Sequence, residues 1–549
     1  MGSPVHIILQ ARVNSARLPG KALLPVAGIP SAVLAGLRAA RSGFPLTAAT
    51  SVAAANDPLA AAFQAAGLPV FRGPEEDVLG RFVSATAALP DRTILVRLTA
   101  DNVVPDGDFI SLLVENLEAG DIEVMGTQAA RGLPYGLSAE VFRLSALRRA
   151  AASTDAPFDR EHVTPWLYRN ASSAPFDRLD GEMDFSCLRC TLDIPDDYRT
   201  LTNLFEGVSD PVGIGWRALV QRLAALPDAP KVCVPQNRRG GARLVLGTAQ
   251  LGAPYGSVRK TRPPSPQQSV ALVRTAIRHG VTHIDTAQAY PGSEARLGAA
   301  LADGWSSRAQ VITKLSLLED IPADASHSVV QKAVDASVAQ SRAKLGLSTL
   351  PVLLLHRAAH LQDWQGAAWR RLLQLRQEGA IGMLGVSVQS VEEARAALAV
   401  TDVRHVQLPC NIFDTRWDEA GIPALAASRP EVVVHARGAM LQGVLLTRDT
   451  EAWPKIQGLD VAGLSNWLAR MVEKFGRRSV ADLCYAWLAA QTWIDAVVVG
   501  MENEPQVVDN AALFARPALD NVALAEITRA RPSVPAALLN PALWPRPAA

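Results

Sequence analysis

The chain has little net charge and few cysteines, and both features exclude classes of protein. Among its 549 residues, 54 Lys and Arg stand against 53 Asp and Glu, which leaves a net charge of +1. A nearly neutral chain supplies no field that would hold a polyanion without specificity, so neither nucleic acid nor an anionic membrane is expected as a partner. Five cysteines are an odd number in a long chain, which favours a reducing compartment over a disulfide framework.

Long apolar runs are also missing. No segment approaches the roughly 20 apolar residues of a membrane span, and the N-terminus lacks the cationic and apolar regions of a secretory signal. We therefore expect a cytoplasmic protein that acts on small molecules, and a homo-oligomer is compatible with this sequence. Cys187 and Cys190 have the spacing of half a zinc site, but no second pair lies nearby, so zinc is not expected.

A chain of this length exceeds the size of a single core, so two or three domains are expected. Residues 237–243 are cationic and include two adjacent glycines, which is typical of a solvated linker. This divides the sequence into a first domain over residues 1–236 and a second over 244–528. Residues 529–549 are rich in proline and are expected to form an extended strap or to be disordered.

The first domain opens with an apolar run at residues 5–10, which predicts a buried strand. The loop that follows carries Arg12, Arg17 and Lys21 together with Ser15. Cationic side chains and backbone N–H groups can surround a triphosphate, although an ordinary solvated basic loop would have the same composition.

Two aspartates follow strand-like runs in this domain. Asp101 follows residues 93–99, and Asp193 follows residues 187–192. Ligands of open α/β sheets bind outside the carboxyl ends of strands, so both carboxylates could meet one Mg²⁺. Asp197 is interpreted as a helix cap, as are Asn56 and Asp196.

Several segments of this domain resemble the cytidylyltransferases that make CMP-activated acidic sugars, and the spore-coat-polysaccharide branch most of all. They lie in the family's order at residues 11–23 (ARVNSARLPGKAL), 71–79 (FRGPEEDVL), 96–102 (VRLTADN), 136–142 (GLSAEVF), 160–165 (REHVTP) and 191–198 (TLDIPDDY). The resemblance implies an α/β, Rossmann-like nucleotidyltransferase domain of the glycosyltransferase-A type, with a mixed sheet.

The resemblance also implies a reaction and a site. The reaction is attack of an acceptor oxygen on the α-phosphorus of CTP with release of pyrophosphate, assisted by Mg²⁺. The implied metal ligands are Asp101 and Asp193, and the implied nucleotide-binding residues are Ala11, Arg12, Ser15, Arg17, Lys21 and Asp101, of which Arg17 and Lys21 are also catalytic. Glu140 and His162 could contact the acceptor, although a lone histidine is more often structural. The attacking group would be the hydroxyl of a keto-acid sugar or the phosphate of an alditol phosphate.

The second domain alternates eight strand-like runs with helical spacers, which predicts a (β/α)₈ TIM barrel. The runs lie at residues 244–246, 283–286, 311–314, 352–356, 384–387, 403–408, 432–435 and 496–500. Residues at the carboxyl ends of these strands should converge on one site.

Asp285, Tyr290, Lys314 and His356 stand at or just beyond three of those ends. With the sequence DTAQAYPGSE at residues 285–294, they resemble the ordered tetrad of the aldo/keto reductases. The resemblance implies that Tyr290 gives a proton to a carbonyl, that Lys314 favours its phenolate, that Asp285 holds Lys314, and that His356 orients the substrate. Taken singly, Tyr290 could be a core residue and Lys314 part of a surface pair.

The same resemblance implies a nicotinamide cofactor, bound without a Rossmann motif. Its expected contacts are Gly247, Asp285, Ser387, Gln407, Gly500, Glu502, Gln506 and Asn510. Residues 500–506 carry two carboxylates and no Lys or Arg, and Glu502 could accept a hydrogen bond from a free ribose hydroxyl, so NADP(H) and NAD(H) are both open. Pro291 stands where the family motif has glycine, which stiffens the loop after Tyr290.

These features together predict a bifunctional enzyme of bacterial surface glycan biosynthesis, with a CTP- and Mg²⁺-dependent cytidylyltransferase joined to an NAD(P)H-dependent reductase. Two alternatives stay open. One half could be catalytically idle and serve as a binding or assembly module, or the barrel could be a nicotinamide sensor that regulates the transferase.

Overall fold

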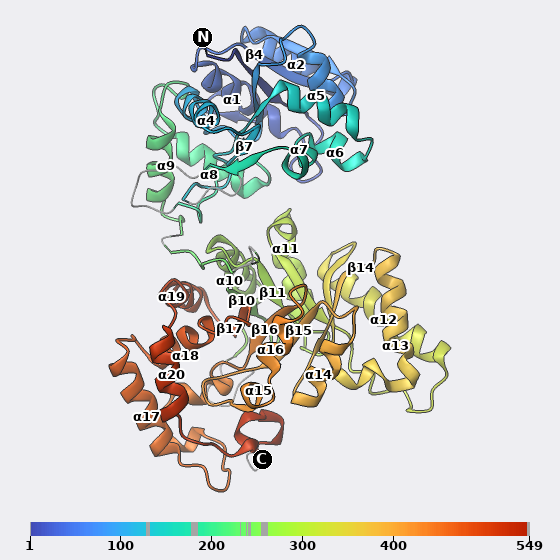
Figure 1. The fold of residues 1–549 in the computed structure, drawn as a ribbon, viewed down its shortest axis with the longest axis vertical. Coiled ribbons are helices and arrows are strands. Elements are labelled where there is room, and N and C mark those ends of the chain that lie inside the picture. Colours follow the sequence, from blue (N-terminus) through green and yellow to red (C-terminus); the bar gives the residue numbers. More distant parts are fainter. Residues whose placement is uncertain are drawn as a thin grey trace. The chain divides into compact units, whose positions relative to one another are not determined.

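The computed structural model describes residues 2–127, 132–176, 185–230, 232–237, 239, 243–253 and 262–545. The chain forms two compact units, Met1–Lys231 and Val232–Ala549, drawn from blue to green and from green to red in Figure 1. Within the predicted linker, Arg238 and residues 240–242 lie outside the described residues. Asn237 and Arg239 hydrogen-bond to Asp495 of the second unit, through its backbone oxygen at 3.0 Å and its carboxylate at 2.9 Å respectively.

The first unit is built on a mixed seven-stranded sheet, which confirms the predicted Rossmann-like class. The order is β5-β4-β1-β6-β8-β7-β9, and β8 runs antiparallel to both of its neighbours. The strands are β1 (Val5–Gln10), β4 (Leu46–Ser51), β5 (Val70–Gly73), β6 (Ile94–Thr99), β7 (Val124–Gly126), β8 (Glu140–Arg143) and β9 (Ser173–Pro175), and β2 (Pro25–Val26) and β3 (Ile29–Pro30) form a separate hairpin.

Helices cover both faces of this sheet, because the buried central strand β1 is apolar on both sides. Ile7 and Leu9 point into one core and Ile8 into the other. The first core is covered by α1 (Ser31–Ala40), α2 (Asp57–Ala65), α4 (Gly107–Ala119), α8 (Pro195–Phe205) and α9 (Trp216–Ala225). The second is covered by α3 (Val78–Ala85), α5 (Leu144–Ser153), α6 (Pro157–His162) and α7 (Pro165–Asn170).

The prediction of a strand at residues 187–192 is wrong. This segment makes only isolated bridges, from Arg189 to Tyr135 and from Thr191 to Asn102. It pairs with two different loops beyond the strand ends, so no continuous ladder can form. The second bridge nevertheless places Asp193 beside Asp101, because the Leu192 N–H donates to the Asp101 carbonyl at 2.8 Å.

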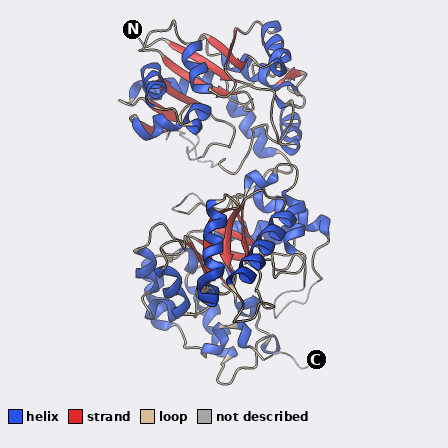
Figure 2. Ribbon diagram, turned by 90° about the vertical axis from the view of Figure 1, so that its right-hand side faces the viewer, coloured by secondary structure: helices blue, strands red, loops and turns tan. Residues whose placement is uncertain are grey.

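The second unit is a closed barrel of eight parallel strands, as predicted, enclosed by helices in Figure 2. Its strands are β10 (Leu244–Gly247), β11 (His283–Asp285), β12 (Gln310–Lys314), β13 (Leu350–Leu355), β14 (Ile381–Ser387), β15 (His405–Pro409), β16 (Val433–Arg437) and β17 (Ala496–Gly500). Its helices are α10 (Pro266–Arg278), α11 (Ser293–Leu301), α12 (His327–Leu345), α13 (Asp363–Gln377), α14 (Val391–Ala399), α15 (Arg416–Glu419), α16 (Ile422–Ala427), α17 (Val461–Lys474), α18 (Val480–Ala489), α19 (Glu504–Phe514) and α20 (Asn521–Ala530). Among the described residues, no helix is long and apolar enough to cross a membrane.

Two forms were expected for the proline-rich tail, an extended strap or disorder, and as far as residue 545 it is a strap packed on the rest of its unit. It forms two 3₁₀ turns, Ala536–Leu539 and Pro541–Leu543. Leu538 is fully buried, and Arg531 donates to the Ile412 carbonyl at 3.0 Å. Apolar side chains between the prolines therefore hold the tail against the barrel, and residues 546–549 lie outside the described part.

Three histidines lie together inside the barrel. The ring centres of His405 and His435 are 4.3 Å apart, and those of His283 and His435 are 5.8 Å apart. Burial lowers the pKa of each, and the neighbouring imidazoles lower the pKa of His405 and His435 further, with that of His405 falling to about 3. The cluster is therefore uncharged at neutral pH.

This cluster predicts an acid-labile barrel. An unfolded histidine takes up a proton below about pH 6.5, whereas folded His405 does not until about pH 3, so its contribution to stability is present above pH 6.5 and is lost as the pH falls towards 3. His405→Leu should reduce the slope of the unfolding free energy of the barrel between about pH 6 and 4 by up to about 1.4 kcal/mol per pH unit. Calorimetry of the full chain measures the slope, and exposed His327→Gln is the control. An unchanged slope in His405→Leu would contradict this account.

Candidate active sites

The first site lies beyond the carboxyl ends of β1 and β6, where the chain turns into a short 3₁₀ segment, Lys21–Leu23. Gly20 precedes it with a φ of 70°, a left-handed conformation that favours glycine, and its N–H donates to the Val13 carbonyl. The Ser31 hydroxyl donates to the Lys21 carbonyl at 2.8 Å. Lys21 is thus fixed at its backbone before its side chain makes any contact.

The Lys21 ammonium bridges the two predicted metal ligands. Its Nζ lies 2.8 Å from Asp101 Oδ2 and 2.9 Å from Asp193 Oδ1. Burial alone would lower the pKa of Lys21, but the two carboxylates outweigh it and raise that pKa, so the lysine is charged at neutral pH. The structure therefore brings Asp101 and Asp193 together, as the sequence predicts, and places between them Lys21, which was expected to hold the phosphates.

Asp193 is the most heavily bonded member of this cluster. Arg17 Nη2 lies 3.0 Å from its Oδ1, Arg189 Nη2 lies 2.8 Å from its Oδ2, and its own N–H donates to Asp197 at 2.9 Å. Burial would raise the pKa of Asp193, but Lys21 and the two arginines lower it, so the carboxylate is ionised. Sequence reasoning missed Arg189. Its position four residues before Asp193 was the only available signal.

The predicted phosphate loop lines a hollow of about 460 Å³. The lining residues are Arg12, Val13, Asn14, Ser15, Ala16, Pro19 and Gly20. Arg12 is largely exposed there, whereas the Ala11 N–H is already donated to the Ala49 carbonyl and the Ser15 hydroxyl accepts the Leu18 N–H. The backbone of Ala11 therefore has no free donor for a nucleotide.

Two interpretations of capping residues have different outcomes. Asn56 occupies the N-cap position of α2, as expected, but its side chain makes no capping hydrogen bond; it accepts the Val13 N–H at 2.8 Å and holds the predicted phosphate loop. Asp197 accepts the N–H groups of Asp193 and Ile194 at the beginning of α8, as expected of a residue at a helix start.

The two residues proposed to contact the acceptor differ in access. Glu140 is buried, pairs with Arg97 and accepts the Thr164 hydroxyl at 2.9 Å. His162 is exposed and its ring lies 4.5 Å from that of Phe158. The charge of the Glu140 carboxylate is thus balanced by Arg97 inside the protein, and of these two residues only His162 is open to solvent.

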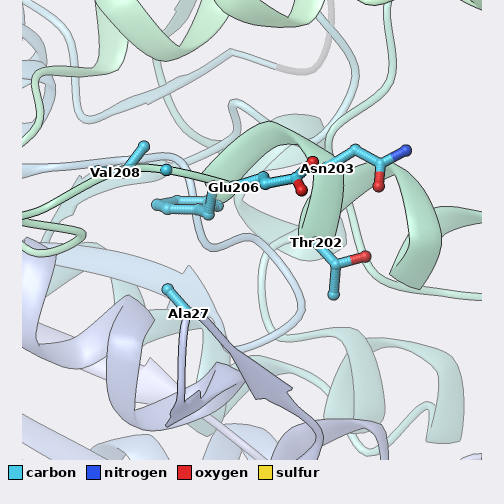
Figure 3. Close-up of a pocket in the computed structure, with 7 residues that line it drawn as sticks. Ala27, Thr202, Asn203, Glu206 and Val208 are labelled. Atoms are coloured by element: carbon cyan, nitrogen blue, oxygen red, sulfur yellow. The ribbon is translucent and has the colours of Figure 1, made fainter.

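Another hollow of the first unit has about 470 Å³ and is drawn in Figure 3. It is lined by Ala27, Thr202, Asn203, Phe205, Glu206, Gly207 and Val208, at the end of α8 and the turn of the β2–β3 hairpin. It shares no residue with the Lys21 cluster and holds one charged group, so it is not the candidate site.

The barrel site is organised by a buried lysine. Lys314 Nζ lies 2.8 Å from both oxygens of Asp285 and 2.9 Å from the Thr286 carbonyl, and Gln407 Nε2 donates to Asp285 Oδ2 at 2.7 Å. Burial alone would lower the pKa of Lys314, but Asp285 outweighs it and raises that pKa. The pair is therefore ionic although Lys314 is only 1% exposed.

Tyr290 and His356 complete the group of four that the sequence predicts. Lys314 Nζ lies 5.2 Å from the centre of the Tyr290 ring, whose centre is 6.1 Å from that of His356. Burial, followed by the charges of Lys314 and Arg437, lowers the pKa of His356 to about 3. His356 is therefore neutral at pH 7, and its buried Nδ1 has no hydrogen-bond partner in the part of the chain that the structure describes. It can orient a carbonyl by hydrogen bonding, but it is not a reservoir of protons.

The barrel mouth also has polar atoms suited to a nicotinamide. Ser387, the last residue of β14, is paired with Gln407 in the middle of β15. Gln407 Oε1 and Asn411 Nδ2 are buried, and neither has a hydrogen-bond partner among the described residues. One is an acceptor and the other a donor, which is what a carboxamide requires. Gly247 and Gly500 are paired at the ends of β10 and β17. These residues fit the expected cofactor.

The remaining residues predicted to contact the cofactor, Glu502, Gln506 and Asn510, lie in the turn before α19 and within that helix. Gln506 Oε1 accepts the Glu502 N–H at 2.9 Å, and Asn510 accepts the Tyr485 hydroxyl at 2.7 Å and donates to the Gln506 carbonyl at 2.8 Å. Their hydrogen bonds shape the turn after β17. The structure shows no hydrogen bond between these three described residues and the Asp285 cluster.

Comparisons with known families agree with the class of enzyme domain expected for each unit. Residues 243–531 match the aldo/keto reductase family, and residues 6–200 match a cytidylyltransferase family. The first match spans more than half of the chain, so the chain belongs to the aldo/keto reductase family. Its first unit carries a cytidylyltransferase domain, and both families are families of enzymes.

Individual relatives match one half or the other. An uncharacterized protein of Methanocaldococcus jannaschii is 33% identical over 165 residues, which cover 30% of this chain and 66% of that protein. The spore coat polysaccharide biosynthesis protein SpsF of Bacillus subtilis is 29% identical over 237 residues, covering 41% of this chain and 96% of that protein. The aldo-keto reductase YhdN of Bacillus subtilis is 24% identical over 285 residues, covering 48% and 83%.

Because Lys314 and Asp285 form a buried ion pair, removing one partner should destabilise the barrel strongly, and removing the second partner as well should restore most of the lost stability. Asp285→Asn leaves a buried ammonium without its counter-charge, which should cost about 3–5 kcal/mol of unfolding free energy. Adding Lys314→Met removes the orphaned charge and should restore most of that loss. Calorimetry of the full chain measures both variants, and the transition of the first unit serves as internal control. A double variant no more stable than Asp285→Asn would show that the pair does not act as described.

Proposed function

We propose that the chain is a bifunctional sugar-activating enzyme. Its first unit transfers CMP from CTP to an acidic sugar or to a sugar or alditol phosphate, and its barrel reduces a sugar carbonyl with NAD(P)H. The observation that carries the proposal is that each unit holds its own charged lysine against carboxylates: Lys21 against Asp101 and Asp193, and Lys314 against Asp285. The similarity of the first unit to a spore coat polysaccharide biosynthesis protein supports a role in bacterial surface glycan biosynthesis.

In the first unit, the residues fit the transfer of a nucleotidyl group. Negative charge gathers on the phosphates as pyrophosphate leaves, and Arg17 and Lys21 are placed to offset it. Asp101 and Asp193 would hold Mg²⁺, since their oxygens already converge on one cation, the Lys21 ammonium. Magnesium is usually held by one or two carboxylates together with substrate phosphates, so a site of this kind needs no third protein ligand. Among the described residues, no group of three or more His, Cys, Asp or Glu is placed to hold a metal.

In the barrel, the residues fit the reduction of a carbonyl. Bound nicotinamide supplies the hydride, and its carboxamide would be held by Gln407, Asn411 and Ser387. Tyr290 gives a proton to the carbonyl oxygen, while the charge of Lys314 favours the phenolate that results. Neutral His356 hydrogen-bonds the same oxygen and sets its direction.

The choice of cofactor depends on the turn after β17. Glu502 and Glu504 lie there and no Lys or Arg does, which gives a 2′-phosphate no counter-charge within residues 500–506. Glu504 accepts the Thr275 hydroxyl at 2.6 Å. Glu502 could accept a hydrogen bond from a free ribose hydroxyl, so NAD(H) is a candidate cofactor beside NADP(H).

Two single substitutions test whether the sites are separate. Asp101→Ala should lower pyrophosphate release from CTP by at least about 100-fold while carbonyl reduction is kept, and Tyr290→Phe should do the reverse. Pyrophosphate release with Mg²⁺ and sugar acceptors, and oxidation of reduced nicotinamide with carbonyl compounds, are measured on each variant. Exposed Asp108→Ala is the control for Asp101→Ala. Loss of both activities in either folded variant would rule out two separate sites.

A further inference from the structure

Arg437 is a cation at the barrel mouth that no part of the proposed reaction uses. It is the last residue of β16 and is partly exposed. Its Nη2 donates to the Val388 carbonyl at 3.2 Å and to Gln389 Oε1 at 2.9 Å. Within the described ranges, no carboxylate forms an ion pair with Arg437, whereas nearby Arg357 pairs with Glu319 at 2.5 Å. The positive charge of Arg437 is therefore not balanced by a carboxylate of the described residues.

The position of Arg437 is on the same face as the reacting groups. All eight strands are parallel, so their carboxyl ends lie on one face of the barrel. Lys314 ends β12 and Arg437 ends β16, and the Arg437 side chain reaches past β15 to the segment that follows β14. After burial and Lys314, the charge of Arg437 is the next cause that lowers the pKa of His356. Arg437 is thus within electrostatic reach of the residue that would orient the carbonyl.

The groups beside Arg437 are donors that lack acceptors. Gln389 Oε1 accepts a hydrogen bond from Arg437, and its buried Nε2 has no partner within the described ranges. The Nε and Nη1 groups of Arg437 also have no acceptor in the described part of the chain. Buried donors without acceptors are costly, and a guanidinium beside an amide N–H matches the oxygens of a carboxylate or a phosphate. The positive charge of Arg437 and the unused N–H groups of Arg437 and Gln389 are therefore suited to bind an anion.

We propose that Arg437 and Gln389 form a subsite that binds the anionic group of the carbonyl substrate. This inference rests on the proposed reductase function and names its substrate class: carbonyl compounds that carry a carboxylate or a phosphate. Hydride adds to the carbonyl carbon and the Tyr290 proton to its oxygen, while the anionic group remains unchanged on Arg437. A sugar of this class would also suit the acid- or phosphate-bearing acceptor proposed for the first unit.

Matched pairs of carbonyl compounds test the subsite in the full-length protein with NADH and with NADPH. Glyceraldehyde and glyceraldehyde 3-phosphate form the phosphate pair, and butyraldehyde and succinic semialdehyde form the carboxylate pair. We expect the wild type to prefer one anionic member by kcat/KM, which identifies the group. Arg437→Gln should lower kcat/KM for that member by about 10- to 100-fold, mainly through KM, and change the neutral member by less than about twofold.

Two further variants sharpen the result. Arg437→Lys keeps the positive charge but lacks the planar guanidinium with its paired N–H donors, so it should retain part of the preference for the anionic compound. It also tests the subsite if Arg437→Gln does not fold. Arg357→Gln removes a cation that a carboxylate already neutralises, so it should leave the preference unchanged.

Several results would overturn the proposal. Equal losses for neutral and anionic members in Arg437→Gln would give the arginine a general role, and a raised KM for the nicotinamide would place it against the cofactor. A wild type with no preference for either anionic member would also reject the subsite. If the wild type reduces no member of either pair, the reductase function itself fails and the subsite fails with it.

Discussion

A lysine ammonium held by aspartate carboxylates is the interaction on which each unit depends. In the first unit Lys21 joins Asp101 to Asp193, and in the second Lys314 lies on Asp285. Each lysine is sheltered from water, so its charge persists only because the carboxylates are present. Those carboxylates reach the lysines only when the sheet or barrel is formed. The fold and the candidate site of each unit are therefore stabilised by the same contacts.

The two lysines differ in how completely they are enclosed. Lys314 is tied to Asp285 and to a backbone carbonyl, and Gln407 fixes the same carboxylate, so its charge stays beneath Tyr290. Such a fixed charge stabilises a developing phenolate without rearrangement. Lys21 is more open, at 14% side-chain exposure, and its two carboxylates are the groups that a divalent cation would need. In the proposed reactions, Lys21 is therefore suited to exchange its partners when a triphosphate and Mg²⁺ bind, whereas Lys314 is suited to remain in place.

Much of this arrangement could be predicted from the sequence, because strand-like runs alternate with helices and the chemical groups follow the runs. All eight barrel strands and the cluster around Lys314 could be predicted in this way. The segment at residues 187–192 looks like a strand but pairs beyond the strand ends, which local pattern does not show. The role of Asn56 depends on Val13, and that of Arg437 on Gln389, and these contacts join residues 43 and 48 positions apart. Only the folded chain shows such contacts.

The most direct test of two catalytic sites in one chain is pyrophosphate release from ATP, CTP, GTP and UTP in turn. The wild-type protein would be assayed with Mg²⁺ and a panel of acidic sugars and sugar phosphates, with and without NADH or NADPH. We expect release to be confined to CTP and to require an acidic or phosphorylated acceptor, and dependence on the reduced cofactor would place reduction first. Equal release from all four nucleotides, or none from CTP with any acceptor, would contradict the transferase assignment and leave the barrel as the only enzyme.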